Sequence, residues 1–226
     1  MPKKIFIVIA AYNEEKRIGK VLSDLKKKRY KNIVVVDDGS SDNTYEVAKK
    51  KKVHVLRHLI NRGQGAALKT GIDFALEKKA DIIVTYDADG QFLAKDIKEV
   101  VKPIKKGIVD VTLGSRFLGN VVNIPTLKKV ALKIGIFVVH ILYKIDVTDS
   151  QCGFRAFSND AAKKIEINAD RMEHAGQILH EIMINKLKYK EIPITVIYDN
   201  YSLKKGQSWK NSIKLGIKML FKRFGR

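Results

Sequence analysis

The sequence predicts an α/β fold, with a mostly parallel central sheet flanked by helices. Short runs of β-branched and other apolar residues alternate with longer, lysine-studded segments over the first half of the 226-residue chain. The runs are almost continuously apolar, which is typical of strands buried on both faces of a parallel sheet. Acidic, aromatic and glycine-rich clusters follow the runs directly, at the carboxyl ends of the strands, where such sheets bind their ligands.

Strands and helices are expected to alternate along the first half of the chain. The predicted strands cover residues 5–10, 33–36, 53–56, 82–86 and 109–113. The predicted helices between them cover about residues 15–28, 43–51, 64–79 and 95–106.

The second half has a different character. Residues 124–145 are interpreted as one or two basic, apolar helices, and residues 150–157 as a loop that enters a strand. A helix is expected over residues 172–187 and a strand over residues 191–198.

The stretch over residues 209–224 is amphipathic. Its apolar residues fall on one helical stripe, and its lysines recur every fourth residue beside that stripe. The stripe is Trp209, Ile213, Ile217, Leu220 and Phe224, and the lysines are Lys210, Lys214, Lys218 and Lys222. Two interpretations stay open: a helix packed on the core, or a basic amphipathic helix lying on an anionic membrane surface.

Composition restricts the class of protein. A content of 45% hydrophobic and 30% charged residues excludes a largely disordered chain. The single cysteine, Cys152, excludes an internal disulfide and a cysteine-built zinc site, and so favours a reducing compartment such as the cytosol. The longest apolar run, residues 134–143, is well short of the roughly 20 residues that span a bilayer, so no transmembrane helix is expected.

The formal net charge is +20, with 44 Lys and Arg against 24 Asp and Glu. Such an excess is typical of proteins that meet nucleic acid, an anionic membrane surface or phosphorylated ligands. The alternative is a lysine-rich solubilising surface, and composition alone does not choose between these readings.

The segment Asp87-Ala88-Asp89-Gly90-Gln91 carries the sharpest chemical signal. Residues two apart on an extended segment point the same way, so both carboxylates would converge at the mouth of the sheet. Unpaired carboxylates repel one another, and a divalent cation removes that conflict. Oxygen ligands favour Mg²⁺ or Mn²⁺, which keep open positions for substrate phosphates. The alternative is an exposed acidic turn.

Weaker signals follow the first two strands and open the third helix. Ala10 to Glu15 and Val36 to Asp42 join aromatic and acidic residues that could bind a nucleoside, although acids at a helix start and a capped turn explain part of both. The turn from Asn61 to Ala67 is glycine-rich, and its backbone amides could face an anion or simply allow close packing. Ser115-Arg116, Asp149 to Arg155 and Lys204-Lys205-Gly206 add cations suited to phosphate.

Taken together, these motifs resemble family 2 glycosyltransferases, and most closely the synthases of dolichyl-phosphate mannose and glucose. The resemblance is dense over about residues 5–160 and looser beyond. It implies a nucleotide-sugar-binding fold of the GT-A kind and inversion at the anomeric carbon. Two residues depart from the family pattern: Ala10 stands where relatives often carry proline, and Gln64 where many carry lysine.

By this resemblance each motif receives an expected role. The residues expected to hold the nucleotide sugar are Ala10, Tyr12, Glu14, Val36, Asp38, Asp87, Ala88, Asp89 and Arg116, with Lys205 closing over its diphosphate. Asp87, Asp89 and Gln91 would hold the Mg²⁺ or Mn²⁺ ion. Arg116 and Arg155 would face the acceptor phosphate.

The expected activity is metal-dependent transfer of a sugar from a donor such as GDP-mannose or UDP-glucose to a polyprenyl or dolichyl phosphate. The enzyme is expected as a peripheral protein on the cytoplasmic face of the membrane, without nucleic-acid partners. The chain would form one domain over residues 1–226, with a nucleotide-sugar part over 1–115, an acceptor part over 116–200 and a basic amphipathic helix over 201–226.

Three alternatives remain. Transfer to a hydroxyl acceptor would need a base, for which Asp149 is the candidate. Nucleotidyl transfer to a sugar phosphate usually needs a basic glycine-rich loop after the first strand, which Tyr12-Asn13-Glu14-Glu15 does not resemble. A nucleic-acid-binding protein is favoured by the net charge alone.

Overall fold

The structure is a computed structural model that describes residues 3–205. A seven-stranded sheet runs through these residues in the order β3-β2-β1-β4-β6-β5-β7. Its strands are β1 (Ile5–Ala11), β2 (Ile33–Asp37), β3 (His54–Arg57), β4 (Ile82–Asp87), β5 (Val111–Val122), β6 (Arg155–Ser158) and β7 (Tyr189–Ile197). β6 is antiparallel to both of its neighbours, and the other strand pairs are parallel.

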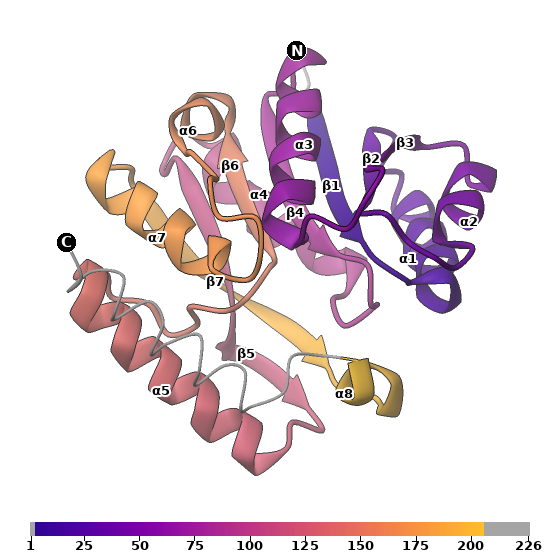
Figure 1. The fold of residues 1–226 in the computed structure, drawn as a ribbon. Helices are drawn as coiled ribbons and strands as arrows, with labels where there is room; N and C mark the ends of the chain where they lie inside the picture. The colour runs from indigo at the N-terminus through magenta and orange to yellow at the C-terminus, as the bar shows by residue number, and fades with distance from the viewer. Residues whose placement is uncertain (1–2, 206–226) are drawn as a thin grey trace.

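Helices cover both faces of this sheet (Figure 1). They are α1 (Glu15–Lys27), α2 (Thr44–Lys50), α3 (Gln64–Glu77), α4 (Ile97–Lys105), α5 (Thr126–Tyr143), α6 (Asn159–Lys164), α7 (His174–Ile184) and α8 (Asn200–Lys205), with a 3₁₀ turn, η1 (Ala94–Asp96), before α4. α1 and α4 pack on one face, and α3, α6 and α7 pack on the other. α5 lies beside α7, and its Val139 joins the core on this second face.

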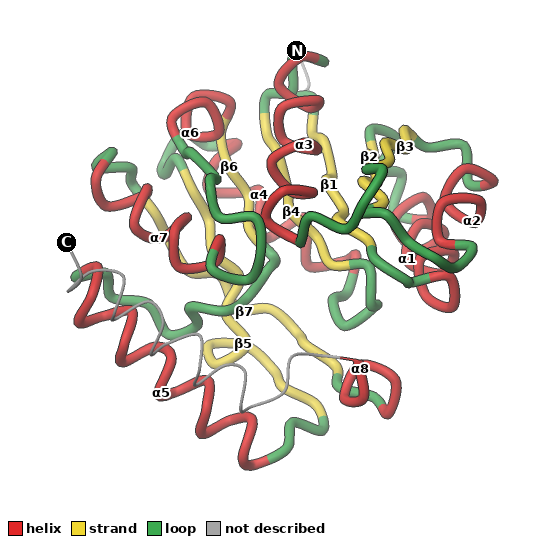
Figure 2. The backbone as a smooth tube through the Cα atoms, in the orientation of Figure 1, coloured by secondary structure: helices red, strands yellow, loops and turns green. Residues whose placement is uncertain are grey.

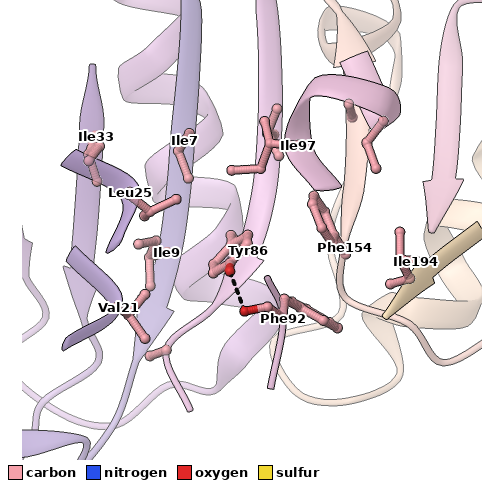
Figure 3. Packing of buried hydrophobic residues seen from close by; sticks show 14 of the residues in the cluster. Ile7, Ile9, Val21, Leu25, Ile33, Tyr86, Phe92, Ile97, Phe154 and Ile194 are labelled. Atoms are coloured by element: carbon pink, nitrogen blue, oxygen red, sulfur yellow. Dashed lines mark hydrogen bonds between the residues drawn. The ribbon is translucent and has the colours of Figure 1, made fainter. Parts of the chain in front are cut away.

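Side chains alternate between the two faces of the sheet along each strand, so each face has its own hydrophobic core. In β1, Ile7 and Ile9 join the core under α1 and α4, whereas Phe6 and Val8 join the core under α3 and α7. Successive side chains of a strand point to opposite faces, so a strand buried on both sides must be apolar throughout. Figure 3 shows the first of these cores, where the Tyr86 hydroxyl donates a hydrogen bond of 2.6 Å to the Phe92 carbonyl.

Strand β5 bends where it leaves the sheet. Its pairing with β7 shifts register between Ser115 and Asn120, where the four residues 116–119 of β5 lie opposite the single residue Ile194 of β7. β6 pairs with β5 only as far as Leu113. Beyond this point β5 and β7 pair only with each other and extend toward α5 and α8 (Figure 1). A bulge of this kind redirects a strand and the side chains on it. Arg116 lies at this bend.

The last turns of several helices carry exposed lysines. Lys26 and Lys27 end α1, Lys49 and Lys50 end α2, Lys102 and Lys105 are in the last turn of α4, and Lys163 and Lys164 end α6. Cations at a helix C-terminus are stabilised by the helix dipole. Because a helix in a βαβ unit runs opposite to its strands, the lysines of α1, α2 and α4 lie toward the amino ends of the strands. These lysines therefore have a structural role at the helix ends.

The predicted α/β fold is confirmed, and the predicted strands of the first half agree with the structure within one or two residues, apart from the longer β5. Residues 124–145 form one helix, α5, the short helix α6 was not expected, and α8 lies at the start of the helix expected over residues 201–226. Residues 206–226, and with them both interpretations of residues 209–224, lie outside the described residues. Among residues 3–205, no helix has the length and apolar character that crossing a membrane requires.

Gly71 sets the distance between α3 and the sheet. A Cβ at this position would lie 2.3 Å from Val8 Cγ1 and 3.2 Å from Val36 Cγ2. Both neighbours are stiff, β-branched core residues, so they cannot move aside. Gly71→Ala is expected to destabilise the protein by about 1–3 kcal/mol through overpacking.

Gly135 in α5 provides the matched control, because a Cβ there has no neighbour within 4 Å. Gly135→Ala is expected to be neutral or to stabilise by up to about 1 kcal/mol, since alanine loses less backbone entropy in a helix. Urea unfolding of both variants measures the difference. Equal stability of the two variants would show that α3 does not pack as closely as described.

Candidate active site

The ends of three parallel strands lie level with one another. Ala10 of β1 pairs with Asp87 at the end of β4, and Ala11 pairs with Asp37 at the end of β2. The loops that follow β1 and β4 leave the sheet at the same edge (Figure 2, green). The register therefore brings together the three clusters that the sequence analysis singled out.

A pocket of about 400 Å³ opens at this edge. The predicted site residues that line it are Ala10, Tyr12, Glu14, Asp38, Asp87, Ala88, Asp89, Gln91 and Arg116. Asn61, Gly63 and Gln64 contribute from the start of α3, Lys128 and Leu132 from α5, and Val196 and Tyr198 from the end of β7. The wall from α3 and β2 faces a second wall from α5 and β7.

Asp87 and Asp89 form an acidic pair in this pocket. Burial raises the pKa of Asp87 to about 6, although Arg116 and Arg155 act in the opposite direction. Burial raises the pKa of Asp89 to about 7, and the charge of Asp87 raises it further. No ion pair within residues 3–205 includes either carboxylate. The pair thus carries negative charge that the described side chains do not neutralise by direct contact.

Neighbouring groups hold both carboxylates in place. The amide of Gln64 donates to Asp87 Oδ1 at 3.2 Å, and the backbone N–H of Gln91 donates to Asp89 Oδ1 at 2.9 Å. A Cβ on Gly153 would lie 2.6 Å from Asp87 Oδ1, so only glycine leaves room for this carboxylate. Gly153 precedes β6, the strand that pairs with β4.

The acidic pair fits a divalent cation. Two carboxylates facing a pocket are the hard oxygen donors that Mg²⁺ and Mn²⁺ prefer. Their raised pKa values are what an unneutralised pair produces, and a cation would reverse them. Residues 3–205 hold no cluster of three or more His, Cys, Asp or Glu side chains suited to a metal. A cation bound here would therefore keep coordination positions for other ligands, such as substrate phosphates.

The carboxylate of Asp38 is held mainly by the protein itself. His58 Nδ1 lies 2.7 Å from Asp38 Oδ1, and His58 Nε2 lies 3.0 Å from Thr70 Oγ1. The backbone N–H groups of Arg62 and Gly63 donate to Oδ1 and Oδ2 at 3.0 and 2.7 Å. A carboxylate offers about four acceptor positions, so Asp38 has little capacity left for a ligand. The loop from His58 to Gly63 is shaped by this carboxylate.

At the first strand end, Tyr12 and Glu14 differ in exposure. Tyr12 is 45% exposed, whereas Glu14 is 7% exposed. The hydroxyl of Tyr201 in α8 donates to Glu14 Oε2 at 3.0 Å, and the Arg17 guanidinium lies 4.7 Å from the centre of the Tyr201 ring. α8 is therefore anchored to the start of α1, beside the pocket.

Arg116 and Asp149 form a buried ion pair. Asp149 Oδ2 accepts hydrogen bonds from Arg116 Nε at 2.6 Å and from the Arg116 backbone N–H at 3.1 Å. Arg116 Nη1 also hydrogen-bonds the Tyr198 hydroxyl. Asp149 does not line the pocket, and most of its acceptor capacity serves Arg116 and the local backbone. It balances and orients the guanidinium that lies in the pocket wall.

Two other predicted residues are placed away from the pocket, and the side chain of a third is not described. Arg155 is 3% exposed, and its guanidinium donates to the backbone carbonyls of Cys152, Ser150 and Ala175. Val36 lies inside β2, packed in the core under α3. Lys205 ends α8, and its side chain lies outside the described part of the structure. The structure therefore does not bring Arg155 or Val36 to the pocket lining.

Cys152 is packed in the core under α1 and α4. It is free and buried, and burial raises the pKa of its thiol to about 12. A thiol with this pKa carries almost no thiolate at neutral pH, so it cannot act as a nucleophile.

The sequence analysis missed Lys128 and Tyr198. Tyr198 ends the predicted strand over residues 191–198, and only the bend in β5 and β7 brings it to the pocket. Lys128 lies beside Lys129 in a basic, apolar segment, and no local signal distinguishes the two lysines. Their difference arises from the rotation of α5 about its axis, because Lys128 faces the pocket and Lys129 is exposed.

Comparisons with known proteins agree with this geometry. The model of the family described as Glycosyl transferase family 2 matches residues 6–166. An uncharacterized protein of Methanocaldococcus jannaschii is 46% identical over 97% of the chain and 90% of that protein. The UDP-N-acetylglucosamine–dolichyl-phosphate N-acetylglucosaminyltransferase of Methanococcus voltae is 37% identical over 99% of the chain and 98% of that enzyme.

A further relative is similar in sequence, and two solved structures are similar in fold. The dolichol-phosphate mannosyltransferase of Pyrococcus furiosus is 34% identical over 85% of the chain and 56% of that enzyme. Glucosyl-3-phosphoglycerate synthase of Mycobacterium tuberculosis, with phosphoglyceric acid, shares the fold with a TM-score of 0.75 at 17% identity, over 99% of the chain and 81% of that protein. The same synthase with Mn²⁺, UDP and glucosyl-3-phosphoglycerate gives a TM-score of 0.69 at 16% identity, with the same coverage.

The raised pKa values of Asp87 and Asp89 predict how stability depends on pH. Both lie above the ordinary value near 4, so the folded protein binds more protons than the unfolded chain between about pH 4 and 7. In the absence of metal, the contribution of this pair to the free energy of unfolding is therefore lost as pH rises through that window. Thermal unfolding in EDTA measures the slope, and the Asp87→Asn/Asp89→Asn double variant is expected to flatten it. Equal slopes for the two proteins would contradict the acidic pair.

Proposed function

The chain belongs to glycosyltransferase family 2, and from this premise we propose that it transfers a sugar from a nucleotide-sugar donor to a polyprenyl or dolichyl phosphate. One observation carries the proposal. The acidic pair Asp87 and Asp89 shares a single pocket with the cations Arg116 and Lys128. This arrangement suits a cation-bound diphosphate on one side and an acceptor phosphate on the other.

The nucleoside of the donor is proposed to lie against the wall from β1 and β2. Tyr12 offers an exposed ring for stacking, and Ala10 and Glu14 line the same part of the pocket. Asp38 contributes mainly through the loop it holds, because three of its hydrogen bonds are already made within the protein. The backbone of Asn61 and Gly63 then forms the edge that a base would meet.

Asp87 and Asp89, with Gln91 beside them, are proposed to hold a Mg²⁺ or Mn²⁺ ion. When bound, such a cation neutralises charge on the diphosphate leaving group. Solved structures of the same fold contain Mn²⁺ together with UDP, which supports a divalent cation in this fold. Gln64 positions Asp87 by a hydrogen bond from a neutral amide, so the negative charge of the pair is left for the cation to neutralise.

The proposed transfer is a single displacement that inverts the anomeric carbon. A phosphate oxygen of the acceptor forms a bond to this carbon while its bond to the diphosphate oxygen breaks, and the electron pair leaves with the nucleoside diphosphate. A phosphate monoester with a second pKa near 6 is already largely dianionic at neutral pH, so no base is required. This agrees with Asp149, whose Oδ2 is engaged by Arg116. Transfer to a hydroxyl would need a freer base.

Relatives that are named for their activity support a lipid phosphate as acceptor but differ in the sugar. They include a dolichyl-phosphate N-acetylglucosaminyltransferase, a dolichyl-phosphate β-glucosyltransferase and a dolichol-phosphate mannosyltransferase. The full-length match to the first of these makes UDP-N-acetylglucosamine the first donor to test, followed by UDP-glucose and GDP-mannose.

An exposed apolar stripe on α5 supports contact with a membrane surface. Its residues recur at intervals of three and four, so they lie on one side of the helix. They are Leu127, Val130, Ile134, Phe137 and Ile141, each more than 40% exposed. Exposed Lys129, Lys133 and Lys144 accompany them on α5 or at its end. An apolar face accompanied by lysines is typical of helices that lie in an anionic lipid interface.

The activity is tested by incubating the protein with each labelled nucleotide sugar, a polyprenyl phosphate and Mn²⁺ or Mg²⁺, and then extracting labelled lipid. One donor is expected to give product that EDTA abolishes. Asp89→Asn is expected to lower kcat by about a hundredfold or more, since cation stabilisation is worth several kcal/mol. Asp73→Asn, which alters an exposed ion pair with Lys69, serves as control. Full turnover of Asp89→Asn would refute the cation site.

The membrane contact is tested by sedimentation with vesicles of equal parts anionic and neutral phospholipid. Ile134→Ser/Phe137→Ser is expected to weaken binding about tenfold or more, because two large side chains would no longer be buried in lipid. Ile108→Ser alters an apolar residue of similar exposure in the loop before β5 and should leave binding unchanged. Equal losses in both variants would argue against α5 as the contact.

A further inference from the structure

Gln151 and Met172 line the pocket but belong to neither of its two facing walls. Gln151 lies in the loop before β6, and Met172 lies in the loop before α7. The Oε1 atom of Gln151 is buried and accepts no hydrogen bond from any residue of the described range 3–205. A buried acceptor without a donor is unfavourable, so this carboxamide gains free energy from a polar ligand in the pocket.

One buried guanidinium brings these two loops together. Arg155 Nη2 donates to the carbonyl of Ser150 and to the carbonyl of Ala175, each at 3.2 Å. Ser150 directly precedes Gln151 in the chain. The backbone N–H of Ala175 donates to the Met172 carbonyl at 3.2 Å. Gln151 and Met172 are therefore held on adjoining segments by a side chain that is itself buried.

The glycine-rich start of α3 allows the loop before α7 to lie close to the acidic pair (Figure 2, green). A Cβ on Gly65 would lie 1.9 Å from the Ala169 carbonyl oxygen, so only glycine permits this contact. Gln64, the neighbour of Gly65, donates to Asp87 Oδ1 at 3.2 Å. The loop that carries Met172 thus packs on the same turn of α3 that holds the first carboxylate.

The sugar of the donor is bonded directly to the diphosphate, so it must lie beside the cation proposed at the acidic pair. Gly153, which leaves room for the Asp87 carboxylate, is two residues from Gln151. The proposed function places the nucleoside at the wall from β1 and β2, and the acceptor phosphate on the side of the pocket cations. The side formed by Gln151 and Met172 is then left for the sugar.

A carboxamide beside a thioether complements one sugar substituent in particular. An acetamido group at C2 combines an N–H donor, a C=O acceptor and a methyl group, and C2 adjoins the carbon that carries the diphosphate. The Gln151 carboxamide can accept from the N–H or donate to the C=O, because rotation about its last side-chain bond is soft. The Met172 thioether offers a polarizable, apolar surface to the methyl group. The 2-hydroxyl of glucose or mannose has no such methyl group.

From this arrangement we propose that Gln151 and Met172 form the subsite for the donor's sugar and select a 2-acetamido sugar. This assignment rests on the proposed function and adds to it the class of sugar and two specificity-determining residues. It does not depend on the sugar that any relative transfers, because it follows from an unfilled carboxamide and an apolar side chain in the pocket of this chain.

Calorimetry in the presence of Mn²⁺ tests the subsite without turnover. The wild type is expected to bind UDP-N-acetylglucosamine about tenfold or more tightly than UDP-glucose, since a carboxamide placed for the acetamido group is left unpaired by a hydroxyl. Gln151→Leu keeps the size of the side chain but removes the carboxamide, and should bring the two affinities to within about twofold of each other. UDP alone should bind both proteins equally, because a merely structural defect would weaken all three ligands alike.

Met172→Gln tests the apolar part of the subsite. This variant is expected to lose about threefold or more of the preference for the acetamido donor, which is the contribution of one buried methyl group. Met183→Gln makes the same substitution in α7, outside the pocket lining, and should keep the wild-type preference. Thermal unfolding confirms that each variant is folded.

Equal affinity of the wild type for the two donors, or an unchanged preference in Gln151→Leu, would overturn the proposal. The transfer assay distinguishes this failure from that of the proposed function. If UDP-glucose labels lipid as efficiently as UDP-N-acetylglucosamine, the acetamido subsite is refuted and the transferase activity stands. If the acetamido donor binds with the expected preference but labels no lipid, the proposed function fails and the subsite stands.

Discussion

Two carboxylates share the end of β4 without a cationic side chain in direct contact with either. Asp87 and Asp89 are held by neutral donors, the Gln64 amide and the Gln91 backbone, and the nearby guanidinium of Arg116 is paired with Asp149. Burying such a pair is unfavourable, which is why both pKa values are raised. The pair lies in the pocket, where a bound cation would offset this unfavourable free energy.

The surrounding structure is fitted to that pair. Gly153 leaves space for the Asp87 carboxylate, and its carbonyl accepts a hydrogen bond from Thr85 of β4 at 2.7 Å. Because β6 runs against its neighbours, the loop before it returns to the edge where the other strands end. Arg155, two residues further on, donates to the Cys152 and Ser150 carbonyls of this loop and to the Ala175 carbonyl of α7. Its buried position gives it a role in holding the loop in the shape that Asp87 requires.

The sequence allowed the position of a site residue to be predicted wherever that residue directly follows a strand. Asp38, Asp87 and Asp89 stand at strand ends, and parallel strands must bring their ends to one edge, so their convergence could be predicted from periodicity. Arg155 and Asp149 could not be placed in this way, because their direction depends on a bulge in β5 and a loop with no periodic pattern. Lys128 was missed for a related reason. A lysine on an amphipathic helix looks the same in sequence whether it faces a pocket or solvent.

The lysines that end α1, α2 and α4 lie toward the amino ends of the strands, opposite the pocket. Long-range attraction to an anionic bilayer would therefore act on the amino-end side of the described molecule as well as on the side that holds the pocket. Under the proposed function, the charge of these lysines can bring the enzyme to the membrane but does not turn the pocket toward it. The orientation is set by the apolar stripe of α5. This contact is short-ranged, so it acts only after α5 has reached the lipid surface.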